Sequence, residues 1–117
     1  MRIHVDDIPP SLNAYWAGAF WAKRAKVADT WHGLFLKALV EAGIKKPLQT
    51  PLIIEVTEYS PRIRDCDNAV IASKLFGDTL VLYGYIPDDT PEFISEVRLK
   101  STKGQKKTII DFQYDTR

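Results

Sequence analysis

The stretch LIIEVTEYSPRIRDCDNAVIASKLFGDTLVL, residues 52–82, is the most informative about the fold because it predicts a strand, a loop and a helix in succession. Residues 52–59 are rich in β-branched and aromatic side chains, which favour a strand. Residues 61–66 predict a loop or the end of that strand. Asp67 or Asn68 then has a side chain suited to cap a helix that runs to about Val81 or Leu82.

The sequence on both sides of this stretch predicts one further helix and three further strands. Apolar residues recur at helical spacing from Val27 to Ala42, and Gly43 ends that helix. Between the last two strands, Thr102 to Gln105 predicts the turn of a hairpin. The three strands are expected at residues 2–5, 93–100 and 107–114.

The order of these elements, β-α-β-α-β-β, predicts an α+β protein whose mixed sheet is covered by two main helices. We expect a single domain, residues 1–117, because this length suits one core. Residues 8–13 predict a rigid, non-helical link, since proline fixes φ. Residues 14–22 could form a loop that packs or stacks, and they carry the aromatic side chains Tyr15, Trp16, Phe20 and Trp21.

The composition excludes some classes of function, but by itself it does not indicate a particular one. Sixteen Lys and Arg residues oppose fifteen Asp and Glu residues, so the net charge gives no indication of a nucleic-acid partner. No apolar run is long enough to span a bilayer, and the N-terminus lacks the apolar core of a signal peptide. We therefore expect no membrane partner and a cytoplasmic location. Cys66 is the one cysteine, which excludes an internal disulfide and favours the role of a small spacer.

The segment Arg62-Ile63-Arg64-Asp65-Cys66-Asp67-Asn68 has the most informative chemistry. If its backbone is extended, Asp65 and Asp67 point to one face and could bind one divalent cation. Arg62 and Arg64 could attract an anion such as phosphate. The segment is therefore a candidate for both cation and phosphate binding.

A second acidic pair, Asp88-Asp89, follows the helix. The sequence Pro-Asp-Asp-Thr-Pro also suits an ordinary turn. Together with Asp65 and Asp67, the pair would place three or four acids in one site, which is unfavourable without a cation. Mg²⁺, or Mn²⁺ in its place, prefers such oxygen ligands.

Asp67, Ile71, Lys74 and Asp78 fall on one face of the expected helix, because their spacing is close to whole helical turns. Two interpretations of this face remain open. Asp67 could hold a cation while Lys74 meets a phosphate. Alternatively, the charges could form a surface ladder of weak ion pairs.

Other catalytic signatures are missing from the sequence. It has no EF-hand loop, no P-loop, no Gly-x-Gly-x-x-Gly and no Gly-x-Ser-x-Gly. His4 and His32 therefore lack a nucleophilic partner, and we expect both to be surface or hydrogen-bonded histidines.

The chain resembles the RusA family of Holliday junction resolvases, which occurs in bacteria and their phages. One matching element is Pro9-Pro10-Ser11-Leu12-Asn13, and the closing Lys103-Gly104 turn also fits. The order Asp-x-Asp-Asn followed by Asp-Asp is the more specific part. It is carried by Arg64-Asp65-Cys66-Asp67-Asn68, Lys74, Asp78-Thr79-Leu80 and Ile86-Pro87-Asp88-Asp89.

The resemblance implies an endodeoxyribonuclease that uses Mg²⁺ and resolves four-way DNA junctions as a homodimer, in DNA recombination and repair. It implies a location in the cytoplasm of a bacterium or of a phage-infected bacterium. It also implies that Asp65, Asp67 and Asp89 are catalytic, metal-binding carboxylates and that Lys74 is the catalytic lysine. Lys74 departs from the family pattern, because it follows Asp67 by seven residues instead of four. A three-residue insertion in the first turns of the helix accounts for this difference.

Basic and polar side chains elsewhere are candidate DNA contacts. They are Arg62, Arg64, Lys23, Arg24, Lys26 and Asn13. Tyr15 and Trp16 could stack at an opened junction centre, or pack in the core or in a dimer interface.

Two other functions remain open. The first is a phage protein of the same fold that binds branched DNA without cleaving it. The second is a nuclease of the Asp…Glu-x-Lys type that uses Asp89 and Glu96, with Arg98 in place of the lysine.

Overall fold

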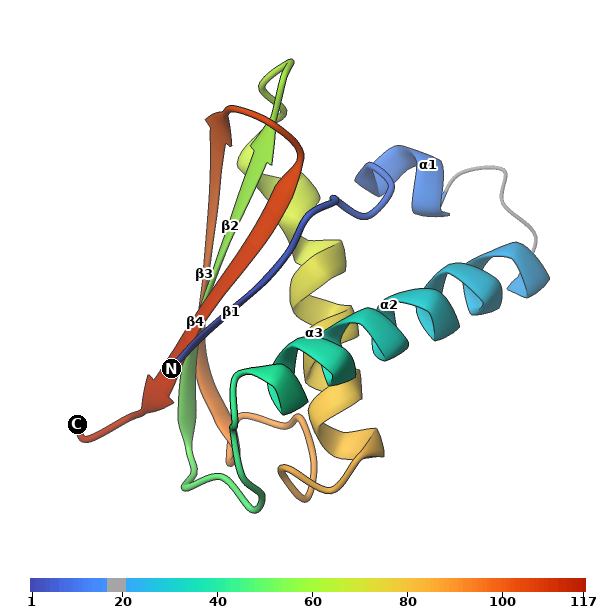
Figure 1. The fold of residues 1–117 in the computed structure, drawn as a ribbon. Helices are drawn as coiled ribbons and strands as arrows, with labels where there is room; N and C mark the ends of the chain where they lie inside the picture. Colours follow the sequence, from blue (N-terminus) through green and yellow to red (C-terminus); the bar gives the residue numbers. More distant parts are fainter. Residues whose placement is uncertain (17–20) are drawn as a thin grey trace.

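The computed structural model describes residues 1–16 and 21–117, and its architecture is α+β (Figure 1). The short α1 is an addition to the predicted order of elements. The strands are β1 (Arg2–Val5), β2 (Leu52–Ser60), β3 (Ile94–Lys103) and β4 (Lys107–Tyr114). The helices are α1 (Leu12–Trp16), α2 (Trp21–Glu41) and α3 (Val70–Leu82), with a 3₁₀ turn, η1 (Cys66–Ala69), before α3.

The four strands form one mixed sheet in the order β1-β4-β2-β3. β2 pairs antiparallel with β4 and parallel with β3, and β1 pairs antiparallel with β4. The predicted hairpin of the last two strands is therefore wrong, because β2 lies between them. β2 is the strand with the most buried residues, and a central position pairs both of its edges.

A short connection, residues 104–106, carries the chain from β3 to β4 over the end of β2. The amide of Gly104 donates a hydrogen bond to the carbonyl of Ser60 at 3.0 Å. A Cβ atom at Gly104 would lie 3.1 Å from Cδ1 of Tyr59, which is closer than an ordinary contact. Glycine therefore lets the connection cross β2 in direct contact with its last residues.

Both α2 and α3 cover the same face of the sheet (Figure 1). Three aromatic rings link α2 through α3 to β4. The ring centroids of Phe35 and Phe76 are 5.5 Å apart, and those of Phe76 and Phe112 are 5.3 Å apart. All three side chains are buried, so the core lies between this face and the two main helices.

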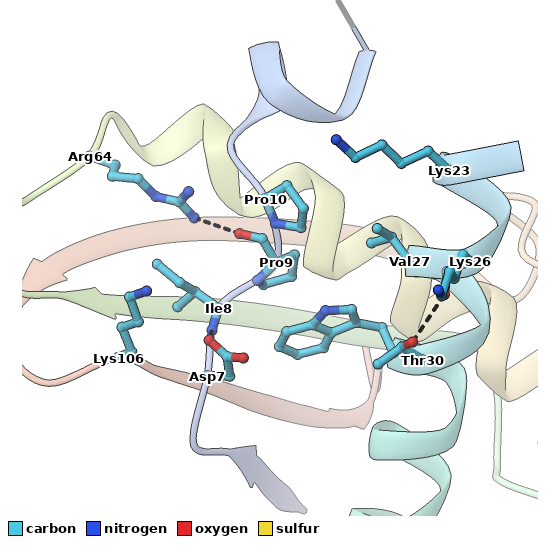
Figure 2. Close-up of a pocket in the computed structure, with 11 residues that line it drawn as sticks. Asp7, Ile8, Pro9, Pro10, Lys23, Lys26, Val27, Thr30, Arg64 and Lys106 are labelled. Carbon is cyan, nitrogen blue, oxygen red and sulfur yellow. Dashed lines mark hydrogen bonds between the residues drawn. The ribbon is translucent and has the colours of Figure 1, made fainter. Parts of the chain in front are cut away.

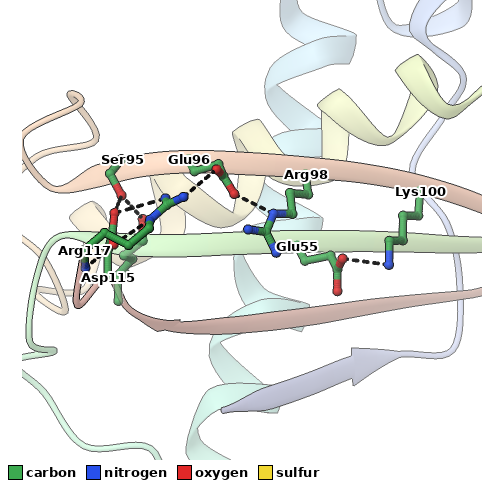
Figure 3. Close-up of polar contacts among 8 residues, drawn as sticks. Glu55, Ser95, Glu96, Arg98, Lys100, Asp115 and Arg117 are labelled. Atoms are coloured by element: carbon green, nitrogen blue, oxygen red, sulfur yellow. Dashed lines mark hydrogen bonds and ion pairs between the residues drawn. The ribbon is translucent and has the colours of Figure 1, made fainter.

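The opposite face of the sheet is open and carries paired charges (Figure 3). Lys100 of β3 contacts Glu55 of β2 at 2.8 Å. Near the C-terminus, Arg117 and Ser95 both donate hydrogen bonds to Asp115. The Arg117 bonds are the main reason that the pKa of this carboxyl lies far below its usual value. Paired charges of this kind are typical of an antiparallel or mixed sheet with one solvated face.

The start of α2 is the first difference from the predicted helices. α2 begins at Trp21, six residues before the predicted Val27. Only its later turns face the core, where Trp31, Phe35 and Leu39 are buried, so its first turns carry no apolar periodicity. None of the helices in the described part of the chain combines the length and apolar character needed to cross a bilayer.

The second difference is α1, which takes in residues that the sequence assigns to a rigid link. Leu12 and Asn13 are helical because Ser11 caps the helix, its Oγ accepting the amide of Ala14 at 3.2 Å. Phe20, which belongs to the same aromatic segment, lies outside the described residues.

Candidate functional site

The carboxylate loop, residues 61–69, leaves β2 and leads into α3. Asp65 has extended backbone angles, φ −59° and ψ 142°, whereas Asp67 lies in the 3₁₀ turn. The predicted extended geometry for this pair is therefore wrong, because helical structure begins at Cys66, between the two acids. Both side chains are exposed, and neither carboxylate forms an ion pair with any residue that the structure describes.

Asn68 fixes the carboxylate loop to the segment that follows β1. Its Oδ1 accepts a hydrogen bond from the amide of Leu12 at 2.8 Å. Its Nδ2 donates to the carbonyl of Asp65 at 2.9 Å. The side-chain cap predicted for Asp67 or Asn68 is not formed: Ala69 is the N-cap of α3. The Asn68 side chain serves the loop instead of the helix.

Arg64 provides a second tie between the same two segments. Its Nη2 donates to the carbonyl of Pro9 at 3.3 Å and to Oε1 of Glu58 at 2.6 Å. Glu58 is 1% exposed and Arg64 is 19% exposed, so this is a buried ion pair. The guanidinium of Arg64 is thus held by Glu58 and by the Pro9 carbonyl, which the sequence did not predict.

Glu58 is the functional-site neighbour that sequence reasoning missed. Burial raises its pKa, and the hydrogen bond and charge of Arg64 oppose that shift in part. A signal was present in the sequence, because Glu58 follows Val56 and Ile54 at alternate, core-facing positions of the strand. An acid on the buried face of a strand needs a cationic partner.

Lys74 lies between two carboxylates on the exposed side of α3. Its Nζ is 3.7 Å from Oδ1 of Asp78 and 3.6 Å from Oδ2 of Asp89. The structure therefore brings Lys74 and Asp89 together. The predicted polar face is interrupted, because Ile71 is buried in the core. Lys74 is 62% exposed, so each ion pair contributes little to stability.

The carboxylate loop and the Lys74–Asp89 pair form separate groups of charges. Within residues 1–16 and 21–117, no three Asp, Glu, His or Cys side chains are grouped closely enough to hold a metal ion. The residues that suit a cation best are Asp65 and Asp67, which are exposed oxygen donors. Mg²⁺ is commonly held by one or two carboxylates, and water and substrate phosphates complete its coordination. Asp65 and Asp67 supply oxygen donors of this type, and both side chains are exposed.

A pocket of about 570 Å³, here called the basic pocket, lies beside the carboxylate loop. Arg64 and Lys106 lie on one side of Pro9, and Lys23 and Lys26 lie on the other (Figure 2). Three candidate DNA contacts thus converge on one pocket from α2 and from the carboxylate loop. Lys106 is a fourth cation that the sequence did not place there.

The remaining candidate DNA contacts lie outside this pocket. Arg62 is exposed in the carboxylate loop, and Asn13 is exposed on α1. The guanidinium of Arg24 lies over the ring of Trp16, 5.2 Å from its centroid. Trp16 is 53% exposed, which leaves part of the ring open to solvent.

Cys66 is exposed in η1. His4 is exposed and lies 3.9 Å from Asp6, as expected for a surface histidine. His32 is half-buried, and its Nε2 atom is buried without a hydrogen-bond partner among the described residues.

The alternative pairing of Asp89 with Glu96 is not supported by their positions. Glu96 binds Arg98 and Arg117 on the open face of the sheet (Figure 3). Asp89 instead pairs with Lys74 of α3, which covers the other face. No family model matches this chain, and no curated protein matches it either.

Proposed function

We propose that this protein is a Mg²⁺-dependent endodeoxyribonuclease of the RusA type that cleaves branched DNA such as four-way junctions. One observation carries the proposal: Arg64 lines the basic pocket and immediately precedes Asp65 in the carboxylate loop. A DNA strand whose phosphates bind in the basic pocket would continue past the loop carboxylates. Phosphate binding beside acidic oxygen donors is the arrangement that metal-assisted hydrolysis of DNA requires.

Four residues of the carboxylate loop have roles in this proposal. Asp65 and Asp67 would hold the cation, which when bound activates water and stabilises the leaving oxygen. Asn68 fixes the backbone of the turn by bonding to the Asp65 carbonyl and to the Leu12 amide. Arg64 would face phosphate while Glu58 keeps its guanidinium in place.

Lys74 and Asp89 would respond to the arrival of DNA. In the protein alone they neutralise one another across 3.6 Å. A phosphate competes for the exposed ammonium of Lys74, and the carboxylate of Asp89 then becomes available as a further oxygen donor. In this proposal the Lys74–Asp89 pair, which is separate from the carboxylate loop in the protein alone, would join the site only when DNA binds.

A twofold homodimer would present two such sites to opposed strands of a junction and give paired cuts. The process served would be recombination and repair of DNA, in the cytoplasm of a bacterium or of a phage-infected bacterium.

The proposal is tested by titrating Mg²⁺ into a mixture of the protein and a synthetic four-way junction. We expect cleavage that depends on the metal and falls by about 100-fold or more in Asp67→Asn. Asp29→Asn is the matched control, because Asp29 is an exposed acid of α2 outside the site. Equal cleavage by Asp67→Asn and Asp29→Asn would contradict the assignment of the loop.

A non-cleaving protein that binds branched DNA is the second candidate. The Lys74–Asp89 ion pair favours it, because Asp89 is neutralised by a neighbour in the protein alone. Such a protein would bind junctions equally well in EDTA and in Mg²⁺, and would yield no product over hours. Metal-dependent nicks in the titration would exclude it.

A further inference from the structure

We infer that the basic pocket holds one unpaired nucleotide of a DNA strand, with its base on the apolar wall and its flanking phosphates at the lysines. This inference rests on the proposed function, because it takes branched DNA as the substrate. Nucleotides at a branch point leave the base stack at lower cost than those within a duplex. The pocket would therefore read the disrupted stacking that distinguishes a branch from a duplex.

The side chains that line the pocket carry more positive than negative charge. Lys23 and Lys26 come from α2, and Lys106 comes from the connection between β3 and β4. None of the three forms an ion pair within the part of the chain that the structure describes. Among the described residues that line the pocket, Asp7 is the one acid, and its carboxylate accepts the amide of Ile8 at 2.8 Å. Three cations without partners create a local positive potential that attracts phosphate.

The wall of the pocket is apolar and fixed in place. Trp31 is 4% exposed and packs against Phe35, with ring centroids 5.3 Å apart. The Pro9 carbonyl is held by Arg64. Val27 and Pro10 also line this side of the pocket. A preformed apolar wall of this kind suits a planar base.

The shape of the pocket favours a nucleotide over the backbone of an intact duplex. Cations stand on both sides of Pro9 (Figure 2). A base between them would have one phosphate near Arg64 and Lys106 and the next near Lys23 and Lys26. The volume of about 570 Å³ lies within the range of small-molecule sites. Cationic grooves with apolar stacking surfaces are how proteins bind single strands.

The test uses Trp31 as a fluorescent reporter in the variant Trp16→Phe/Trp21→Phe, because the chain has three tryptophans. A thymidine trinucleotide with phosphates at both ends is titrated in EDTA. The same trinucleotide without its central base is titrated in parallel. We expect a saturable change in Trp31 fluorescence and about tenfold tighter binding of the trinucleotide that has its base.

Charge variants provide the second measurement. Lys23→Gln/Lys106→Gln should weaken trinucleotide binding about tenfold and reduce its dependence on salt. Lys37→Gln/Lys45→Gln removes the same charge away from the pocket and should bind as the parent does. Circular dichroism checks that both variants are folded. Equal affinity for the two trinucleotides, or unchanged binding by Lys23→Gln/Lys106→Gln, would overturn the inference.

The binding test and the cleavage test fail independently. Binding is measured in EDTA, where metal-dependent cleavage does not occur and Asp29→Asn should bind as the parent protein does. Base-dependent binding without any metal-dependent cleavage would support the inferred nucleotide site and reject the proposed nuclease activity. Metal-dependent cleavage together with equal affinities for the two trinucleotides would reject the inferred nucleotide site and leave the proposed nuclease activity supported.

Discussion

Asn68 connects segments that lie 56 residues apart in the chain, through its bond from the Leu12 amide. The same side chain closes the turn that carries Asp65 and Asp67. Its contribution is therefore to fix the backbone of the turn that carries the two acids beside the segment that lines the basic pocket. A short amide side chain suits this task because it both accepts and donates.

Replacing Asn68 by Ala removes both bonds and leaves the Leu12 amide without its partner. We expect the free energy of unfolding to fall by about 1–3 kcal/mol, measured by urea denaturation. Asn68→Asp keeps an oxygen for Leu12 and loses only the donor to Asp65, so its loss should be smaller. Equal losses in the two variants would contradict this account of the contact.

The buried pair of Glu58 and Arg64 predicts a pH dependence of stability. The pKa of Glu58 in the folded protein is raised above its ordinary value of 4.5, chiefly by burial. The folded state therefore binds this proton more tightly than the unfolded chain does, and stability is lost as pH rises through the raised pKa. Glu58→Gln has no such proton to lose.

We expect the free energy of unfolding of the parent, minus that of Glu58→Gln, to decrease as pH rises above 4.5. Urea denaturation of both proteins at a series of pH values, from about pH 4 to about pH 8, measures the difference. A difference that increases with pH would show that Arg64 lowers the pKa more than burial raises it.

At the scale of residues, the sequence identifies groups that carry chemistry better than it identifies their partners. The motif singles out Arg64 and Asn68, but Pro9 and Leu12 lie far away in the chain. Contacts between such distant segments depend on topology, which no local pattern contains. Glu58 is different, since its place on the apolar face of a strand was visible in the sequence.

At the scale of elements, the connection over β2 is the feature that most distinguishes this sheet from a simple meander. Gly104 lies against Tyr59, and its amide is bound to the end of β2. β3 and β4 can therefore flank β2 although they are neighbours in the chain. The requirement for glycine comes from the tyrosine ring beneath it.

Gly104→Ala should lower the free energy of unfolding by about 1 kcal/mol, because the new Cβ crowds the ring of Tyr59. The loss should largely disappear when Gly104→Ala is made in a Tyr59→Ala background. A double-mutant cycle by urea denaturation measures this coupling. Equal losses in both backgrounds would mean that the ring is not the cause.

The predicted and observed elements agree where local patterns are strong. β1 and β4 have the predicted bounds, residues 2–5 and 107–114. The first turns of α2 and the whole of α1 escaped prediction, because neither buries an apolar stripe in the core. The order of the strands in the sheet was not predicted either, since an alternating pattern does not show which strand lies beside which. The central position of β2 follows from its burial, which requires a neighbour on each edge.

At the scale of the whole molecule, the proposed paired cuts require two copies of the chain. We expect a dimer with one parent subunit and one Asp67→Asn subunit to nick one junction strand and leave the opposed strand intact. Co-expression with two affinity tags isolates this mixed dimer. If one mixed dimer cuts both opposed strands, a single subunit must cleave both strands, which would contradict the proposal. Recovery of monomers alone would contradict the twofold arrangement.

The most direct measurement is to map cleavage on a four-way junction labelled in turn on each of its four strands, with Mg²⁺ present. We expect nicks at symmetric positions in two opposed strands, present with the parent protein and with Asp29→Asn and missing with Asp67→Asn. An intact junction under these conditions, or the same nicks with Asp67→Asn, would contradict the proposal.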